Sequence, residues 1–383
     1  MKEGWEYKRF DEIMSPAKVE RCGNRIDLPV LSITMHGGIV EQNDRFKKTI
    51  ASLDRTNYKI VKDGQLVIAF PIDEGLLYTQ DVAPEGIMSP AYNIWDVDYS
   101  QIDRRFLVAY FHSTVAFAYI KAKLRGSTQR RRSMDKADLL SMPIPVPSLD
   151  NQQQIVSELD LLSGVIEKQK TQLEELDKLA QSIFYDMFGD PVTNEKGWKQ
   201  EKLGHIFQTS SGGTPSKNNI DYYEGGSIPW LRSGEVSQGF IYKTELFITE
   251  AGMNNSSAKI FPVDTVAIAM YGATVGQVGI IKVPMTTNQA VCGLFPNPDY
   301  SPIFMMYFLK GMQPVYLKDA AGGAQPNISQ GIIKNTYIPL IPLSLQQEFA
   351  AKVEAIEAMK AKVRQSLKEA ETLFNERMDY YFN

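Results

Sequence analysis

The chain has 383 residues, of which 43% are hydrophobic and 22% are charged, and its formal net charge is −4. This length suits two or three domains, and the composition excludes a largely disordered chain. No apolar run approaches the ~18 residues of a membrane span, and the start lacks the apolar stretch of a signal peptide. We therefore expect a cytoplasmic protein without a membrane partner. Its two cysteines, Cys22 and Cys292, are too few and too far apart for a disulfide framework or a zinc site.

The first globular segment, residues 1–149, has the pattern of a mixed α/β domain. Short runs rich in β-branched residues, such as QLVIAF over 65–70, predict strands. The apolar stretch RRFLVAYFHSTVAFAYIKAKLR over 104–125 predicts core-packed helices. GSTQRRRS follows over 126–133, where Gly126 would let the backbone approach a phosphate, and Arg or Gln side chains could form paired hydrogen bonds with the edges of nucleic-acid bases. A solvated loop after a helix is the alternative interpretation.

Residues 150–190 are predicted to form one long helix. Mainly apolar residues recur at alternating steps of four and three, which is the heptad pattern of a coiled coil. We call this row of residues, which would face a partner helix, the seam. Asp150 and Gln153 have the spacing of a capping box at the start, and FGDP from Phe188 ends the helix. The segment carries three Lys/Arg and nine Asp/Glu, so the acidity of the chain is concentrated here. The seam consists of Ile155, Leu159, Leu162, Ile166, Gln169, Leu173, Leu176, Ala180, Ile183 and Met187.

The second globular segment, residues 191–343, repeats the mixed pattern of the first. TVAIAMYG over 265–272 and AVCGLF over 290–295 predict strands, and SPIFMMYFLKGMQPVYLKDA over 301–320 predicts core helices. GGAQPNIS over 322–329 follows these helices, as GSTQRRRS does in the first segment. The fold class predicted for both segments is therefore α/β, of the mixed α+β kind.

The last segment, residues 344–383, is a second copy of the long helix. Adding 194 to each seam position, without a gap, gives a second seam with two cationic interruptions. Ser344 with Gln347 repeats the capping-box spacing. The seam does not say whether the two helices pair parallel or antiparallel, and two unrelated amphipathic helices are the alternative. The second seam consists of Phe349, Val353, Ile356, Lys360, Val363, Leu367, Ala370, Phe374, Arg377 and Tyr381.

The globular segments also repeat each other, more faintly, in the same order. GWEYKRFDEI from Gly4 resembles GWKQEKLGHI from Gly197, and DGQLVIAF resembles VDTVAIAM. The chain is thus predicted to be a tandem duplication with domains at 1–149 and 191–343 and helices at 150–190 and 344–383.

These motifs carry a resemblance to a known family. VAIAMYGATVGQVGI, MTTNQAV, GGAQPNIS and IPLIPLSLQQEFAAKVEAIEA entering a long helix resemble the specificity subunits of type I restriction–modification systems. The resemblance covers nearly the whole chain and is closer in the second half. In the first half GSTQRRRS departs from the Gly-Gly pattern, and MSPAY stands in place of TTNQAV.

The resemblance implies two pseudo-symmetric target recognition domains separated by a long antiparallel two-helix coiled coil. Each domain would read one half of a split, asymmetric target in double-stranded DNA, with half-sites about one turn of duplex apart. The helices would set the spacing and dock methyltransferase subunits, and a restriction/translocase subunit would complete the complex. The chain itself would be non-catalytic and hold no cofactor, with S-adenosylmethionine, ATP and Mg on the partner subunits.

Candidate DNA-binding residues lie mainly in the two glycine-containing loops and near them. Without the resemblance, each could equally be a surface, turn or capping residue. The candidates are Lys121, Lys123, Arg125, Ser127, Gln129, Arg130, Arg131 and Arg132 in the first half, and Thr214, Lys217, Arg232, Asn288, Gln289, Gly322, Gly323, Gln325, Asn327 and Ser329 in the second.

Outward apolar residues on the long helices are candidates for docking the methyltransferase. Such stripes also broaden packing within a chain, which is the alternative interpretation. The docking candidates are Leu161, Val165, Leu179, Met359 and Leu373.

Enzyme interpretations find little support in the motifs. FPNPDY from Phe295 has Asp299 where amino-methyltransferases have a second proline, and no Gly-Lys pair for a nucleotide-binding loop occurs. The three histidines, His36, His112 and His205, have no metal-ligand spacing. The remaining alternatives are a specificity module of a related methylation-based defence system, a stand-alone DNA-modifying enzyme, and a coiled-coil scaffold without DNA contact.

Overall fold

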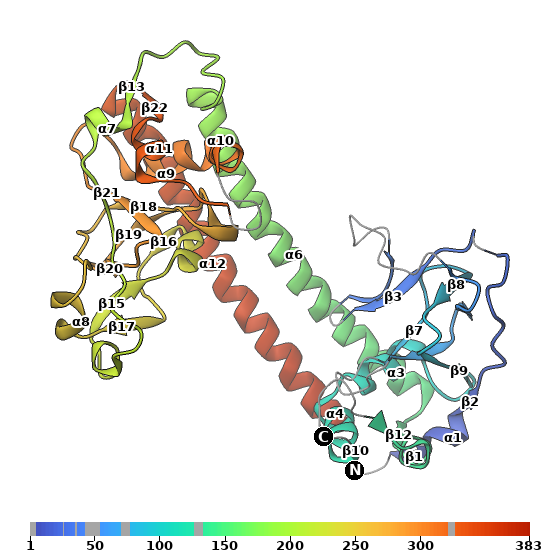
Figure 1. The fold of residues 1–383 in the computed structure, drawn as a ribbon. Coiled ribbons are helices and arrows are strands. Elements are labelled where there is room, and N and C mark those ends of the chain that lie inside the picture. Colours follow the sequence, from blue (N-terminus) through green and yellow to red (C-terminus); the bar gives the residue numbers. More distant parts are fainter. Residues whose placement is uncertain are drawn as a thin grey trace. The chain divides into compact units, whose positions relative to one another are not determined.

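A computed structural model describes residues 5–25, 27–34, 37–42, 54–69, 77–125, 133–320 and 326–383. The chain divides into two compact units, which are described separately. Unit 1 comprises Met1–Lys170 and Gln365–Asn383, and unit 2 comprises Thr171–Arg364. Each unit therefore contains one globular domain, half of each long helix, and its own core (Figure 1).

The domain of unit 1 is built on small antiparallel sheets. The largest has the strand order β2-β9-β6-β7, and its inner face carries the core residues Leu66, Leu77 and Trp95. The strands are β1 (Glu6–Arg9), β2 (Met14–Pro16), β3 (Leu31–Thr34), β4 (Gly38–Glu41), β5 (Lys59–Lys62), β6 (Leu66–Ile68), β7 (Leu77–Thr79), β8 (Glu85–Met88), β9 (Asn93–Val97), β10 (Leu124–Arg125), β11 (Ser133–Met134) and β12 (Pro143–Val146); the helices are α1 (Phe10–Ile13), α3 (Arg104–Phe111), α4 (Thr114–Lys123) and α5 (Lys136–Leu140).

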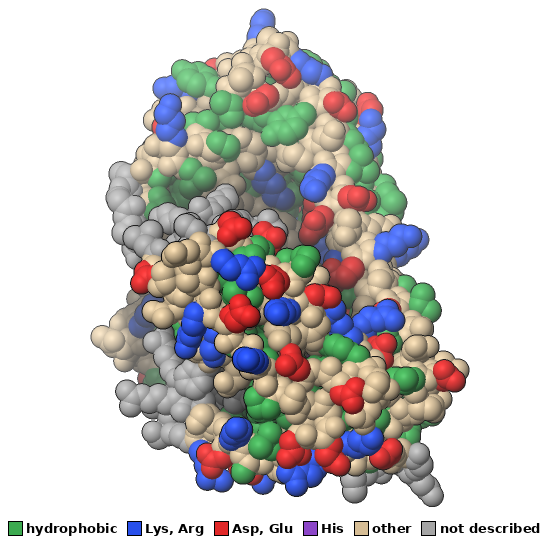
Figure 2. Space-filling view, turned by 90° about the vertical axis from the view of Figure 1, so that its right-hand side faces the viewer, with side chains coloured by type: hydrophobic (Ala, Val, Ile, Leu, Met, Phe, Trp, Pro, Cys, Tyr) green, Lys and Arg blue, Asp and Glu red, His purple; other side chains and the backbone are tan. Residues whose placement is uncertain are grey.

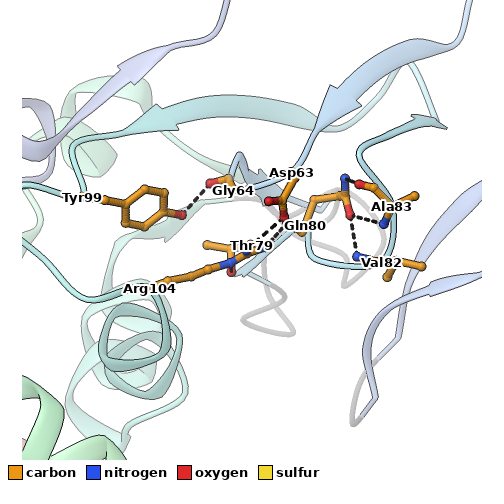
Figure 3. A network of polar contacts seen from close by, with 8 residues as sticks. All are labelled: Asp63, Gly64, Thr79, Gln80, Val82, Ala83, Tyr99 and Arg104. Atoms are coloured by element: carbon orange, nitrogen blue, oxygen red, sulfur yellow. Dashed lines mark hydrogen bonds and ion pairs between the residues drawn. The ribbon is translucent and has the colours of Figure 1, made fainter.

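A polar network fixes the loops around the start of α3 (Figure 3). The Arg104 guanidinium donates to Asp63 Oδ1 at 3.0 Å, to Thr79 Oγ1 at 3.0 Å and to the carbonyl of Gln80. The fully buried Gln80 side chain bonds the backbone of its own loop at Val82 and Ala83. Arg104 is therefore a structural cation whose charge is used within the domain.

The domain of unit 2 has a larger main sheet. Its strand order is β14-β21-β18-β19-β16, and a second sheet has the order β17-β15-β20. The strands are β13 (Gln200–Lys202), β14 (Thr209–Ser211), β15 (Ile228–Leu231), β16 (Phe240–Ile241), β17 (Leu246–Ile248), β18 (Val266–Ala269), β19 (Val278–Ile281), β20 (Thr286–Thr287), β21 (Val291–Leu294) and β22 (Tyr337–Pro339); the helices are α7 (Leu203–Ile206), α8 (Glu250–Asn254), α9 (Pro302–Gly311), α10 (Gln313–Asp319) and α11 (Gln330–Lys334), with 3-10 turns η3 (Ile220–Tyr222), η4 (Ser233–Gln238) and η5 (Gly272–Thr274).

The two long helices predicted from the repeat are confirmed. They are α6 (Leu149–Phe188) and α12 (Leu343–Phe382), and every predicted seam residue is buried or half-buried. Their cores merge with the domains: Phe184 and Phe188 of α6 join the core of unit 2, and Met378 and Phe382 of α12 join that of unit 1. The mixed α+β fold class is confirmed as well.

Contacts within each unit decide the direction of pairing, which the seam left open. In unit 1, Glu158 bonds Arg377 and Tyr381, and Gln169 Nε2 donates to Ser366 Oγ at 2.6 Å. In unit 2, Lys360 Nζ lies 2.6 Å from Asp177 Oδ1, and Lys352 Nζ lies 3.9 Å from Met187 Sδ. Positions along α6 rise as positions along α12 fall, so the helices pair antiparallel in both units, and the interpretation of two unrelated helices is wrong.

The predicted capping boxes are wrong. Both helices begin one residue before the predicted starts, so Asp150 and Ser344 lie inside the first turn. At α6 the amide of Asn151 donates to Ser148 Oγ at 3.4 Å, and at α12 the amide of Leu345 donates to the carbonyl of Pro342 at 3.0 Å. The proline-rich lead-in already presents these acceptors, so the helix starts earlier than the Gln153 and Gln347 spacing suggested.

The domains meet the helices through matching aromatic pairs. In unit 1 the ring of Phe106 on α3 lies 5.4 Å from that of Phe382, and in unit 2 the ring of Phe304 on α9 lies 4.9 Å from that of Phe188. Phe382 is the repeat equivalent of Phe188. The duplication therefore extends to the joint between each domain and its helix pair. No helix among the described residues has the length and apolarity needed to cross a membrane.

Candidate nucleic-acid interface

One edge of the main sheet in unit 2 collects several sequence-predicted DNA-binding residues. The ends of β14 and β18 and the start of β21 meet there, because Ser211 pairs with Cys292 and Ala269 with Val291. Asn288 and Gln289 lie just before β21, separated from it by Ala290, and the amide of Asn288 donates to the carbonyl of Leu231 at 2.9 Å. The GGAQPNIS loop reaches the same edge, since Asn327 forms a β-bridge with Tyr271 after β18.

Close backbone packing explains the glycine pair that leads to Thr214. The amide of Gly212 donates to the carbonyl of Val291 at 3.2 Å, and that of Gly213 donates to the carbonyl of Thr287 at 2.8 Å. A Cβ at Gly212 would lie 2.1 Å from Thr287 Oγ1, and one at Gly213 would lie 2.2 Å from the amide nitrogen of Ala258. Only glycine fits at both positions, and the loop carrying Thr214 is thereby held beside Asn288.

Two amide oxygens at this edge are left without a partner. Asn288 Oδ1 and Gln277 Oε1 are buried and accept no hydrogen bond from any described residue. A buried polar atom without a partner costs ~1–3 kcal/mol, so such atoms mark places where water or a ligand supplies the missing bond. Amides are also the groups that pair with adenine edges.

The other candidates in unit 2 differ in how available they are. Gln289, Asn327 and Lys217 are exposed, whereas Ser329 caps α11 by accepting from the amide of Ile332 at 3.2 Å. Arg232 is paired with the carboxylates of Glu235 and Glu245. A guanidinium with two carboxylate partners presents little net charge to a phosphate, so Arg232 orders its own loop in this structure.

Sequence reasoning did not single out Tyr271 and Gln277, which lie at the same edge. Tyr271 is 42% exposed and lies two residues after the end of β18, and the turn between Tyr271 and Gln277 contains Gly272 and Gly276 at positive φ. The sequence feature that could have identified them is their position, since both residues flank a glycine-rich turn between two predicted strands. The thiol of nearby Cys292 has its pKa raised to about 12 by burial, so it does not provide a thiolate at this edge.

In unit 1 the described part of the basic stretch is largely neutralised. Lys123 lies 3.1 Å from Asp138, and Arg125 lies 2.6 Å from Asp135 and 3.3 Å from Asp138. Lys121 is exposed, and no ion pair within the described part of the chain involves it. On the face drawn in Figure 2, Lys/Arg and Asp/Glu side chains are interspersed.

Several candidates fall outside the described residues. They belong to the loop between β10 and β11, which pair as a short antiparallel ladder, and to the start of the GGAQPNIS loop. These are Ser127, Gln129, Arg130, Arg131, Arg132, Gly322, Gly323 and Gln325.

The predicted docking residues are all exposed on the long helices. Leu161 is 73% exposed, and the other four are between 45% and 47% exposed. Val165 and Met359 are repeat equivalents, as are Leu179 and Leu373, so unit 1 carries Val165 and Leu373 and unit 2 carries their equivalents Met359 and Leu179. Among the described residues, no group of three His, Cys, Asp or Glu side chains could hold a metal ion.

Comparison with known families gives a clear assignment. The type I restriction modification DNA specificity domain matches the chain twice, over residues 3–178 and 195–371. The chain belongs to this family. The two matches coincide with the two copies of the repeat, each consisting of a globular domain and the start of a long helix.

Individual relatives agree with the assignment. The specificity subunit of the Escherichia coli restriction enzyme EcoR124I/EcoR124II is 27% identical over 250 residues, which cover 63% of this chain and 61% of that protein. The MjaIX specificity subunit of Methanocaldococcus jannaschii is 32% identical over 160 residues, covering 40% of this chain and 37% of that protein. The matched part thus spans about six tenths of the E. coli relative.

Solved structures share the fold along the whole length. A chain from a structure described as the assembly and conformational transition of the type I R-M system is 17% identical, with a TM-score of 0.60 over 100% of this chain and 98% of that one. The S subunit from M. genitalium is 16% identical, with a TM-score of 0.54 over 98% and 95% of the two chains.

Proposed function

We propose that this chain is the DNA sequence-specificity subunit of a type I restriction–modification complex. Each globular domain would read one half of a split, asymmetric target in double-stranded DNA, and α6 and α12 would set the gap between the half-sites. The observation that carries the proposal is the tandem family match, each copy of which leads into one helix of an antiparallel pair.

The sheet edge of unit 2 supports a role in base reading. It exposes the amide side chains of Gln289 and Asn327, and the ring of Tyr271 beside a glycine-rich turn. Base edges are read by such bidentate amides, whereas phosphates are bound mainly by cations. Arg232, Lys123 and Arg125 lie in internal ion pairs, so we expect these three cations to contribute little to phosphate binding.

Sequencing methylated adenines in a host that carries the system tests the function directly. The expected result is one bipartite motif with a fixed gap, and exchanging domain 1 for that of another specificity subunit should change only one half. Methylation without a split motif would contradict the proposal. A specificity module of a related methylation-based defence system would give the same motif without DNA cleavage.

In the proposed complex the chain is non-catalytic and holds no cofactor. S-adenosylmethionine would bind the methyltransferase subunits, and ATP and Mg would bind the restriction/translocase subunit. Tight binding of S-adenosylmethionine by the isolated chain would favour a stand-alone DNA-modifying enzyme instead. DNA affinity of the complex that does not depend on salt would favour a scaffold without DNA contact.

The exposed apolar pairs on the helices are proposed to dock the methyltransferase subunits. Leu161→Asp should release the methyltransferase during co-purification while the chain stays folded. Thr171→Asp, also exposed on α6, is the matched control and should leave the complex intact. Retention of the methyltransferase by Leu161→Asp would instead assign this residue to the solvent-facing surface.

A further inference from the structure

A fully buried glutamine lies in the first turn of each long helix. Gln152 on α6 and Gln346 on α12 are both 0% exposed, and they are repeat equivalents. Their sequence neighbours Gln153 and Gln347 are exposed. A buried polar side chain at the same position of two copies requires a physical reason, because an apolar residue would avoid the desolvation cost.

In unit 1, Gln152 joins the helix to the domain with three hydrogen bonds. Its Oε1 accepts from the amide of Asp103 at 2.6 Å, and its Nε2 donates to the carbonyls of Gln101 at 3.1 Å and Pro147 at 2.8 Å. Asp103 in turn caps α3, since its side chain accepts from the amides of Arg105 and Phe106. The glutamine therefore holds the start of the domain's central helix against the first turn of α6.

Unit 2 repeats the arrangement with different neighbours. Gln346 Oε1 accepts from the amide of Ser301 at 2.9 Å, and its Nε2 donates to the carbonyls of Asp299 at 3.2 Å and Ile341 at 2.8 Å. Ser301 caps α9 by accepting from the amide of Phe304 at 3.4 Å. Three bonds to equivalent backbone groups thus recur although the bonded residues differ in type.

Among side chains of this length, only glutamine meets the chemistry of the site. One acceptor and two donors must reach three backbone groups, and a primary amide supplies this set. Glutamate would lose both donors and place a charge against two carbonyls, while methionine would match the length and leave the backbone groups unpaired. Hydrogen bonds are directional, so these three bonds restrict the angle between domain and helix more tightly than apolar packing alone would.

We propose that Gln152 and Gln346 are positioning residues that fix the angle of each domain on its helices, and thereby the gap between half-sites. This inference rests on the proposed function. α6 and α12 each contribute to both units. A change in the angle between a domain and its helix would therefore change the number of base pairs between the two half-sites that the domains bind together. The aromatic joints at Phe106 and Phe304 keep the domain attached, and the glutamines set its orientation.

Gln152→Met tests the inference in the full chain with its methyltransferase partner. The affinity for DNA is measured on targets with unchanged half-sites, in which the gap between the half-sites is correct, one base pair shorter or one base pair longer. The wild type should strongly prefer the correct gap, and Gln152→Met should reduce that preference about tenfold, equivalent to ~1.4 kcal/mol, with unchanged base preference within each half-site. Gln346→Met should act alike, and the exposed controls Gln153→Met and Gln347→Met should match the wild type.

The outcomes separate the inference from the proposed function. Loss of affinity on all targets with an unchanged gap profile would overturn the positioning role, because a purely structural role predicts that pattern. No split-target preference in the wild type would instead contradict the proposed function.

A second measurement applies if Gln152→Met does not fold. Hydrogen exchange of the wild-type complex should show the amides of Asp103 and Ser301 protected as strongly as the helix cores. Fast exchange at both amides would overturn the inference.

Discussion

Units 1 and 2 share one architecture but stabilise their helix pairs differently. At the seam position occupied by Ile166 in unit 1, unit 2 has Lys360, which is only 6% exposed and lies 2.6 Å from Asp177 and 2.5 Å from Glu357. Unit 1 has its polar contacts at other positions, where Glu158 bonds Arg377 and Tyr381 and Gln169 bonds Ser366. Each polar cluster occurs in one unit only. The repeat therefore determines the apolar seam, whereas the polar contacts between α6 and α12 differ from one unit to the other.

The aromatic joints provide the largest test of this comparison. Phe188→Ala should destabilise unit 2 by about 4 kcal/mol, and Phe382→Ala should destabilise unit 1 by about 3 kcal/mol. Phe188 has the larger effect because it contacts three aromatic rings, those of Phe184, Phe304 and Phe349, whereas Phe382 contacts Phe106 and Tyr110. Denaturant unfolding of the full chain measures the loss in free energy of unfolding for both variants, with Leu161→Ala as an exposed control. Equal losses would contradict the expected difference between the units.

The predicted DNA contacts should differ in kind between the two units. Arg131→Ala should weaken DNA binding by ~1–3 kcal/mol and relax one base position if the guanidinium forks onto a base. If Arg131 binds phosphate, the loss should be uniform across sequences and the salt slope should fall by about one. Asn327→Ala should alter base preference without changing the salt slope. No change in affinity or slope for Arg131→Ala would remove that loop from the interface.

The buried lysine of unit 2 can be exchanged for the residues of unit 1. Lys360→Ile should destabilise the chain by about 1–2 kcal/mol, because Glu357, whose side chain is 24% exposed, loses its nearer cation and keeps only Arg364 at 3.7 Å. Adding Glu357→Ser, which imports the equivalent Ser163 of unit 1, should restore stability to within about 0.5 kcal/mol of the wild type. Thermal and denaturant unfolding measure both variants. Additive losses in the double variant would show that Lys360 has a role beyond its ion pair.

The smallest effect concerns the polar contact of unit 1 and its pH dependence. The hydrogen bond from Tyr381, together with Arg377, lowers the pKa of Glu158. A lowered carboxyl pKa gives stability above the unfolded value of about 4.3, which is lost as pH falls through the folded value. Tyr381→Phe should therefore cost about 0.5 kcal/mol at pH 7, and this loss should shrink as pH falls through the folded pKa of Glu158. Unit 2 has Met187 at the equivalent position, so Met187→Leu should show no such pH dependence; a loss independent of pH would assign the Tyr381 effect to packing.

Much of this architecture was predictable because it depends on periodicity. The ungapped repeat predicted both long helices, and the strand-like runs at 65–70, 265–272 and 290–295 contain β6, β18 and β21. The capping boxes at Asp150 and Ser344 were wrong because a spacing of polar residues does not reveal which earlier oxygen already caps the helix. The same first turns contained Gln152 and Gln346, whose burial depends on backbone groups about fifty residues away.

For the candidate interface, sequence and structure contributed different parts. The sequence pointed to Thr214, Asn288, Gln289 and Asn327 separately, and the order of strands brings them to one sheet edge. It also proposed Arg232, Lys123 and Arg125 as cations for DNA, but their carboxylate partners are set by tertiary contacts. Charge in a sequence does not reveal its counter-charge when an ion pair joins positions that no local pattern connects, as Arg232 and Glu245 do.

The sequence by itself determined the duplication, the heptad seam and the order of domain and helix, since these follow from side-chain periodicity along the chain. Only the tertiary structure decided that the helices pair antiparallel, that a glutamine in each first turn is buried, and which cations are neutralised. Those features depend on which distant backbone and side-chain groups are brought together, and hydrogen bonds and ion pairs form only at those short distances.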